Sequence, residues 1–309
     1  MPLNKRNLII PIAFLLYVGG NVGKSYEITP AQAIPQKSGS TTSLSKVDST
    51  STPHSGPASG SDQSTIVPKK TSQAAPDSSW WSRKIEHPEF NLGERLEFSV
   101  KYGKIPAGTA ILELTDTTTY DNHLCYHVTS TASSNDFVSV FYRVRDTVET
   151  YLDVAGVFPR RFRKLLREGN YKMDRITEFD QRKHLAITGN DTVPTYAFVQ
   201  DPLSSLYFIR TQKLVPGKDI LIDNHTDKKN YPLKVIVYRK ERVEVPAGTF
   251  DCVVIEPVMR AQGIFQAKGR IWIWITDDEY KMPVMMKSEV YFLGSVSAQL
   301  SSYRHGKIG

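Results

Sequence analysis

Apolar and polar residues alternate one by one along much of this chain after residue 94, and this period of two is the pattern that most limits its fold. From Leu96 to Tyr102 the apolar side chains fall on one face of an extended chain and the polar ones on the other. Such a segment is typical of an antiparallel strand with one buried face. The same pattern predicts strands at Ala110–Leu114, Leu124–Ser130, Val138–Val144, Thr147–Leu152, Arg161–Arg167, Arg175–Phe179, Leu233–Tyr238, Val253–Val258, Ile271–Ile275 and Val284–Phe292.

Two short turn patterns occur twice. Ile105–Thr109 reads IPAGT and Val245–Thr249 reads VPAGT, in each case between predicted strands, where Pro fixes φ and Gly allows a positive φ. An Asp also precedes a Pro by six positions at Asp153 and again at Asp277. These repeats predict two related hairpin units in one sheet.

One helix is predicted, over about residues 201–214. Asp201 can cap free backbone N–H groups and Pro202 suits the first helical turn. Leu203, Leu206 and Tyr207 follow at helical spacing, and Pro216–Gly217 ends the segment. An amphipathic helix among strands either lies against the sheet or fills the mouth of a barrel. The fold class is therefore mainly β.

The N-terminal residues 1–33 have the features of a signal peptide. Lys5 and Arg6 precede an apolar run from Leu8 to Gly19, and Ala31–Ala33 supplies small residues of the kind that a signal peptidase reads. The run is shorter than the approximately 20 residues of a membrane-spanning helix, so we expect cleavage and no transmembrane helix afterwards. The sequence predicts an exported protein.

Residues 34–79 are rich in Ser, Thr, Pro and Gly and nearly lack large apolar side chains. Such a segment cannot bury enough apolar surface to offset its ordering entropy, and it predicts a disordered tether. The tether is either a simple spacer or a means of reaching across the cell envelope. Trp80 begins the return of bulky residues, and residues 80–309 are enough for a single β-rich domain.

The net charge of +7, from 39 Lys and Arg against 32 Asp and Glu, favours anionic partners but lacks a nucleic-acid-binding pattern. Arg161, Arg163 and Arg167 would share one strand face, which could contact lipid phosphates through bidentate hydrogen bonds. The alternative is that this row is the solvated outer face of the sheet.

Cys125 and Cys252 are the two cysteines of the chain. Export to an oxidising compartment permits a disulfide between them. The alternative is two separate buried thiols that act as small hydrophobic residues.

Motifs of known catalytic sites are absent from the sequence, including G-x-S-x-G, H-E-x-x-H, the Walker A loop and the dinucleotide fingerprint. His123 and His127 could share a strand face, but their pattern is too sparse for us to expect a metal site. Asp277, Asp278 and Glu279 are acidic residues between two strands and favour a turn over paired catalytic carboxylates. We expect no enzyme activity and no cofactor.

A ligand site is suggested by aromatic residues. Trp272 and Trp274 alternate with isoleucines, so this strand is apolar on both faces, and one face could line a cavity. Met282, Met285 and Met286 follow on the next strand, and Met adapts readily to apolar pockets. The alternative is ordinary core packing. The residues expected to line the site are Phe98, Tyr102, Leu203, Tyr207, Trp272 and Trp274.

Four segments, taken in order, resemble an exported bacterial family known as domain of unknown function 3108. They read GERLEFSVKYGKIPAGTA, QDPLSSLYFIR, VEVPAGTFDC and IWITDDEYKMPV, and the resemblance spans about residues 88–303. It implies a curved antiparallel sheet or incomplete β-barrel with a covering helix, similar to periplasmic lipoprotein and lipid carriers. It brings no catalytic residues.

These observations lead to one main hypothesis and two alternatives. The first is a non-enzymatic protein of the bacterial periplasm or outer cell envelope that carries a lipid, a lipoprotein acyl chain or another apolar ligand in the concave face of its sheet. The second is a structural or interaction module that binds an envelope polymer or partner protein. The third is a hydrolase that acts on envelope polymers through the acidic residues 277–279.

Overall fold

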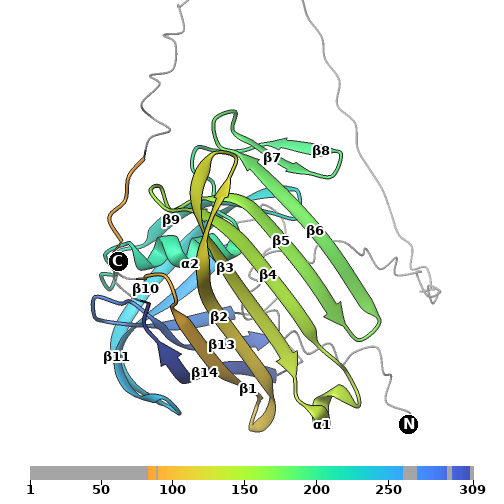
Figure 1. The fold of residues 1–309 in the computed structure, drawn as a ribbon. Helices are drawn as coiled ribbons and strands as arrows, with labels where there is room; N and C mark the ends of the chain where they lie inside the picture. Colours follow the sequence, from red (N-terminus) through yellow and green to blue (C-terminus); the bar gives the residue numbers. More distant parts are fainter. Residues whose placement is uncertain (1–82, 88–89, 260–269, 291–293, 307–309) are drawn as a thin grey trace, which may run out of the picture. The chain divides into compact units, whose positions relative to one another are not determined.

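The computed structural model describes residues 83–87, 90–259, 270–290 and 294–306, and these form one antiparallel sheet of fourteen strands with two short helices (Figure 1). The predicted signal peptide and tether lie outside the described residues. The strands are β1 (Arg95–Tyr102), β2 (Ile105–Tyr120), β3 (His123–Ser134), β4 (Arg145–Asp153), β5 (Pro159–Glu168), β6 (Tyr171–Asp180), β7 (Leu185–Thr188), β8 (Asp191–Pro194), β9 (Ile220–Thr226), β10 (Lys229–Val245), β11 (Gly248–Met259), β12 (Arg270–Thr276), β13 (Pro283–Val290) and β14 (Gly294–Arg304). The helices are α1 (Asp136–Ser139) and α2 (Pro202–Arg210).

The strand order joins two meanders. β1 to β8 pair in sequence, β9 to β14 pair in sequence, and β1 pairs with β14 to connect the two series. β8 and β9 are therefore the two edges of an open sheet, and α2 lies between them in the chain. The predicted mainly-β fold with an incompletely closed sheet and a covering helix is confirmed.

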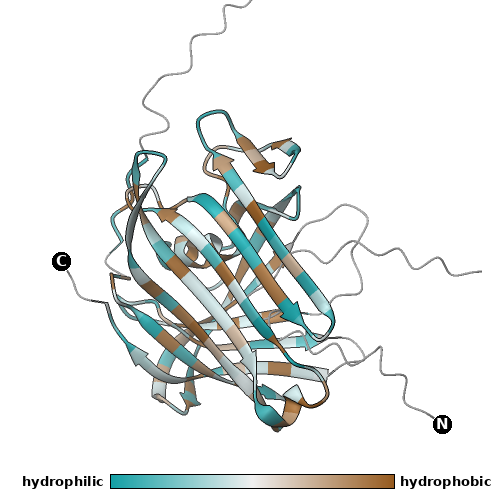
Figure 2. Cartoon of the chain, turned by 45° about the vertical axis from the view of Figure 1, so that its right-hand side comes forward, coloured by the Kyte–Doolittle hydropathy of each residue, from teal (hydrophilic) through white to brown (hydrophobic). Residues whose placement is uncertain are grey.

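Period-two alternation locates most of the strands correctly. Leu96, Phe98 and Val100 of β1 are buried, whereas the intervening residues are partly exposed. Figure 2 shows hydrophobic and hydrophilic bands alternating along the strands. The expected strand at Val138–Val144 is wrong, since Asn135 caps the helix α1 there by accepting the Val138 N–H at 2.9 Å.

The repeated turn patterns differ in how well they locate the hairpins. Asp153 ends β4 and Pro159 begins β5, while Asp277 follows β12 and Pro283 begins β13, as the second pattern predicts. The PAGT motif forms the β10–β11 turn, but its first copy lies inside β2 because Gly103 and Lys104 make that turn.

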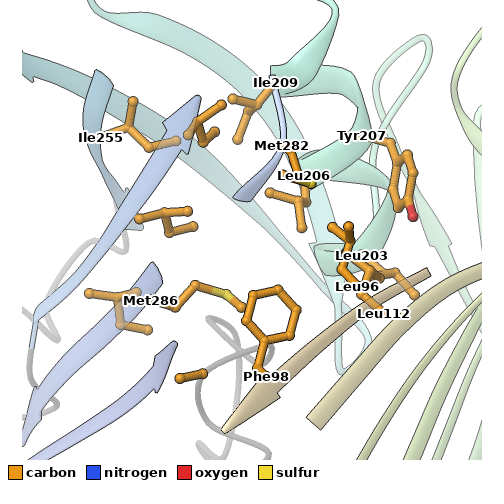
Figure 3. Packing of buried hydrophobic residues seen from close by; sticks show 14 of the residues in the cluster. Leu96, Phe98, Leu112, Leu203, Leu206, Tyr207, Ile209, Ile255, Met282 and Met286 are labelled. Carbon is orange, nitrogen blue, oxygen red and sulfur yellow. The ribbon is translucent and has the colours of Figure 1, made fainter. Parts of the chain in front are cut away.

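The buried core surrounds α2, around which the sheet curves (Figure 1). The helix begins as predicted but ends at Arg210, before the expected residue 214. Figure 3 shows Leu203, Leu206, Tyr207 and Ile209 of α2 among side chains from both meanders, including Phe98 and Met286. Burial of these apolar side chains stabilises the fold by about 1.5 to 3 kcal/mol for each large residue.

β9 and the turn that follows it contact the rest of the domain through side chains and one short bridge. Gln200, just before α2, donates its N–H to the Asp223 carbonyl at 2.8 Å and accepts the His225 N–H at 2.7 Å. At the turn that follows β9, Asp227 forms ion pairs with Lys164 of β5 and Arg175 of β6. Polar contacts therefore take the place of the strand ladder that would close a barrel.

Candidate functional site

A small apolar cavity lies between α2 and the inner face of the sheet. Its volume is about 50 Å³. Most of its lining is aliphatic, with side chains from α2, β9, β10, β11, β12 and β13. We call it the α2 cavity; it is lined by Pro202, Leu203, Ser205, Leu206, Ile209, Asn224, Leu233, Pro257, Ile273 and Met286.

Asn224 gives the α2 cavity a polar side. The residue is 3% exposed, and its Nδ2 donates to Ser205 Oγ at 2.8 Å. Its Oδ1 has no hydrogen-bond partner within the described part of the chain. Because buried polar atoms are normally paired, an unpaired carbonyl oxygen on a residue that lines the cavity is a candidate acceptor for a bound molecule or for water.

The next two residues of β9 are also polar. His225 and Thr226 are both buried, and His225 Nε2 and Thr226 Oγ1 also lack partners among the described residues. His225 Nδ1 lies 2.7 Å from Asn230 Oδ1, and burial lowers the pKa of the imidazole, which favours its neutral form. By strand alternation Thr226 shares the cavity-facing side of β9 with Asn224, whereas His225 points to the other face, where its ring lies edge-on to Phe179.

The first turn of α2 is held by Asp201. Its Oδ1 accepts the N–H groups of Leu203 and Ser204 at 2.7 and 2.8 Å, and its Oδ2 accepts Thr150 Oγ1–H at 2.6 Å. Burial raises the pKa of this carboxyl to about 6, against the opposing effect of these hydrogen bonds. The cap fixes the helix end that carries Leu203 into the cavity.

The structure does not gather the six predicted ligand residues at one place. Leu203 lines the α2 cavity, whereas Phe98 and Tyr207 are fully buried in the surrounding core (Figure 3). Tyr102 is partly buried and packs against the same core.

Trp272 and Trp274 point to the face of β12 opposite Ile273, which lines the cavity. The Arg270 guanidinium lies 4.5 Å from the centre of the Trp272 ring, and the Trp274 indole N–H donates to Glu241. Of the three methionines singled out in the sequence, Met286 lines the cavity. Alternation separates Ile273 from the two tryptophans without showing which face meets the cavity, and nothing in the sequence distinguishes Asn224.

Two of the three arginines in the predicted basic row have carboxylate partners in the sheet. Arg163 Nε and Nη2 donate to the two Asp174 oxygens at 2.9 and 2.8 Å, and Arg161 Nε lies 3.4 Å from Glu178 Oε1. Arg167 is exposed near the end of β5. The pairing of Arg161 and Arg163 with carboxylates fits a solvated outer face of the sheet better than it fits a free anion site.

Cys125 of β3 and Cys252 of β11 are free, buried thiols in this structure. Five strands lie between them in the sheet order. Burial raises the pKa of each thiol to about 12.

The acidic residues after β12 serve the turn. Asp278 Oδ1 accepts the N–H groups of Tyr280 and Lys281 at 3.0 and 3.1 Å, and Asp277 Oδ2 lies 2.5 Å from Lys240 Nζ. His127 Nε2 lies 3.9 Å from Glu149 Oε2. Within the described ranges, no group of three or more His, Cys, Asp or Glu side chains is placed to hold a metal ion.

Neither of the helices in the described part of the chain has the length and apolar content needed to span a bilayer. A search of curated proteins found no match.

Solved structures with a similar fold share little sequence with this chain. A β-barrel-like protein of domain of unknown function DUF1849 from Brucella abortus has a TM-score of 0.51 and 10% identity, and the match covers 71% of this chain and all of that one. A protein from Parabacteroides distasonis, provisionally described as a lipoprotein, has a TM-score of 0.34 and 10% identity over 72% and 99% of the two chains. A Bacteroides fragilis protein with a YmcC-like fold, provisionally described as exported, has a TM-score of 0.32 and 11% identity over 72% and 99%.

The Brucella structure has a β-barrel-like fold in common with this chain, without indicating an activity. The family described as protein of unknown function DUF3108 matches residues 97–301, which include all of β2 to β13 and most of β1 and β14. The four segments that suggested this family lie wholly or largely within that range. The chain therefore belongs to the DUF3108 family.

Proposed function

We propose that this protein is an exported, non-enzymatic protein of the bacterial cell envelope that binds an amphipathic ligand in the α2 cavity. The ligand class is a lipid or the acyl chain of a lipoprotein. The observation that carries the proposal is the combination of an aliphatic lining with one unpaired, buried acceptor, Asn224 Oδ1. Ligand sites typically combine an apolar surface with a few polar groups that fix orientation.

The size of the cavity limits how the ligand enters. A volume of about 50 Å³ is smaller than the roughly 150 Å³ cavity that accommodates a benzene molecule. The end of an acyl chain fits only in part, and more of it can enter only if Leu206 and Ile209 of α2 are displaced from the sheet. Leu206 and Ile209 then exchange contacts with the sheet for contacts with the ligand, which keeps apolar surface buried.

Export is supported by the residues that precede the domain. Lys5 and Arg6, the apolar run and the small residues before Ile34 form a complete signal-peptide pattern. The second candidate, a module that binds an envelope partner through the basic row, has less support because Arg161 and Arg163 are already paired within the sheet.

The test is native mass spectrometry with lipid extraction on the chain from Ile34, purified gently from its own envelope. We expect a stoichiometric amphipathic ligand on the natural sequence. Leu233→Phe adds bulk at the cavity wall and should lower ligand occupancy at least ten-fold, while Asn224→Leu should shift the bound species towards molecules without a donor group.

Trp272→Ala is the matched control, because it removes a large apolar side chain from the opposite face of the same sheet. It should leave occupancy unchanged. Circular dichroism confirms that each variant is folded. A mass without ligand on the natural chain, or full occupancy in folded Leu233→Phe, contradicts the proposal.

A further inference from the structure

Three large apolar side chains are exposed together around α1. Phe137, Val140 and Phe141 are 64%, 79% and 71% exposed, and the two phenylalanine rings lie 5.9 Å apart in an edge-to-face arrangement. Figure 1 shows α1 at one end of the sheet, near the turn that joins β1 and β2. Exposed apolar groups of this kind mark contact surfaces more often than scattered single residues do.

The segment that carries these side chains is firmly attached to the sheet. Asn135 accepts the Val138 N–H at 2.9 Å and donates through Nδ2 to the Pro106 carbonyl at 2.9 Å. Ser134 Oγ accepts the Val144 N–H at 2.9 Å, and Val138 is buried beneath the helix. The three apolar side chains therefore face solvent on a fixed support, although burial would be favourable.

Basic side chains surround the same end of the sheet. The Gly169 N–H donates to the Arg143 carbonyl at 2.8 Å, which places the β5–β6 turn beside the α1 segment. The adjoining segments carry exposed cations, and no ion pair within the described part of the chain engages any of them. These cations are Lys104, Arg143, Arg145, Arg167 and Lys172.

The acidic side chains in these segments are fewer. Asp136 is exposed, and Glu168 is partly exposed. Burial and the neighbouring Asp146 carboxylate raise the pKa of Glu168 to about 7, so its carboxyl carries only part of a negative charge at neutral pH. Asp174, the next acidic residue of β6, is paired with Arg163, so the region carries a net positive charge.

We propose that this end of the domain docks on an anionic phospholipid surface. The tip surface consists of Phe137, Val140 and Phe141 with the five cations named above. The apolar side chains enter the headgroup region, where phenylalanine is favoured, and the cations contact lipid phosphates. This inference goes beyond the proposed function, since none of these residues lines the α2 cavity.

A bilayer fits the tip surface better than a protein partner does. Three apolar side chains are few for a stable protein interface, which buries about 800 Å² on each partner. Shallow insertion combined with several cations is sufficient for reversible membrane binding, because each cation near an anionic surface strengthens partition about five-fold. The charge of the tip surface is complementary to anionic headgroups.

The experiment is vesicle flotation of the chain from Ile34 with phosphatidylglycerol–phosphatidylcholine vesicles and with pure phosphatidylcholine. We expect binding to the anionic vesicles only, weakened when NaCl rises from about 0.05 to about 0.5 M. Phe137→Ala with Phe141→Ala should lower the partition coefficient at least ten-fold, as should Lys104→Gln with Lys172→Gln. In Phe141→Trp, anionic vesicles should shift the indole emission to shorter wavelength.

Matched controls remove similar groups elsewhere. Leu221→Ala takes away an apolar side chain that is 70% exposed on β9, and Lys213→Gln with Lys218→Gln removes two exposed cations outside the tip surface. Both should bind vesicles like the natural chain, and so should Leu233→Phe, which separates this test from that of the α2 cavity.

Three outcomes overturn the proposal. The first is failure of the natural chain to bind anionic vesicles at low salt. The second is undiminished binding by the double phenylalanine variant. The third is equal binding to a soluble polyanion with no emission shift of Phe141→Trp on vesicles, which would indicate a charged polymer or an acidic protein as the partner.

Discussion

Arg210, the last residue of α2, and Glu94, which precedes β1, form a buried, doubly hydrogen-bonded ion pair across 116 positions of sequence. The Nη1–Oε1 and Nη2–Oε2 distances are 2.7 and 2.6 Å, and the side chains are 0% and 2% exposed. Arg210 also donates to the Tyr280 carbonyl at 3.0 Å, so one guanidinium connects the helix to both meanders. The cation lies where the helix dipole favours it.

Removal of the Glu94 charge should destabilise the protein strongly. Glu94→Gln leaves the Arg210 cation buried without its carboxylate, and we expect a loss of about 3 to 5 kcal/mol in the free energy of unfolding by urea. Glu97→Gln is the control, because Glu97 is partly exposed and 3.7 Å from Arg95, and it should cost less than about 1 kcal/mol. Equal losses of stability in the two variants would contradict a special role for the buried Arg210–Glu94 ion pair.

Asp201 should make stability depend on pH in the acidic range. Its carboxyl pKa is about 6 in the folded protein and about 3.8 otherwise, so the folded state binds the proton more tightly. The stability that Asp201 contributes is therefore fully present below about pH 4, falls as pH rises to about 6 and is lost above; this contribution falls by about 2 to 3 kcal/mol in total.

Asp201→Asn preserves the helix cap and removes this titration. Urea unfolding of both proteins at several pH values between about 4 and 7 measures the difference. A difference in stability between the two proteins that stays constant over this range would show that the Asp201 pKa is not raised.

Asp227 should hold the β9–β10 turn against β5 and β6. Its carboxylate pairs with Arg175 and with Lys164, whose pKa burial lowers to about 8. Asp227→Asn weakens both contacts with a buried cation nearby, and we expect a loss of about 3 kcal/mol with faster amide exchange at the β9–β10 turn. Asp191→Asn breaks the more exposed Lys228 pair and should cost less than about 1 kcal/mol; a similar loss there would argue against a special role for Asp227.

Cys125 and Cys252 should resist alkylation in the folded protein. Both thiols are fully buried with pKa values of about 12, so little reactive thiolate is accessible at pH 8. We expect modification of both only in denaturant, whereas an added thiol at the exposed position of Ser302→Cys should react at once. An intact mass two hydrogens below the sequence value would instead show that the pair is oxidised.

Alternation predicted most of the fold because one-sided burial in a sheet imposes a period of two. It failed at Val138–Val144, where Val140 and Phe141 are apolar and exposed, and a hydropathy pattern cannot recognise that combination. It also missed β9, an edge strand whose apolar Leu221 is exposed while its polar Asn224 and His225 are buried. In both segments, contacts with residues distant in sequence decide which side chains are buried.

The repeated PAGT motif predicted one turn correctly but did not show why each of its glycines is needed. Gly248 has φ +139°, as a turn glycine should, but Gly108 is required for another reason: a Cβ there would lie 2.0 Å from the Ser133 carbonyl oxygen on β3. The sequence located Leu203 and Met286, which line the cavity, but it grouped the tryptophans with them. The side of β12 that faces α2 is set by packing across the sheet, which a single strand does not encode.

The pairing of β1 with β14 has a consequence for the order in which the domain is built. A chain that emerges N-terminus first can form each hairpin from β1 to β8 as it appears, yet one side of β1 keeps unpaired N–H and C=O groups until the last strand arrives. Such an edge is a template for pairing with other chains. The interval between synthesis of the first and last strands is thus when this protein is most exposed to aggregation, and most dependent on a chaperone to shield that edge.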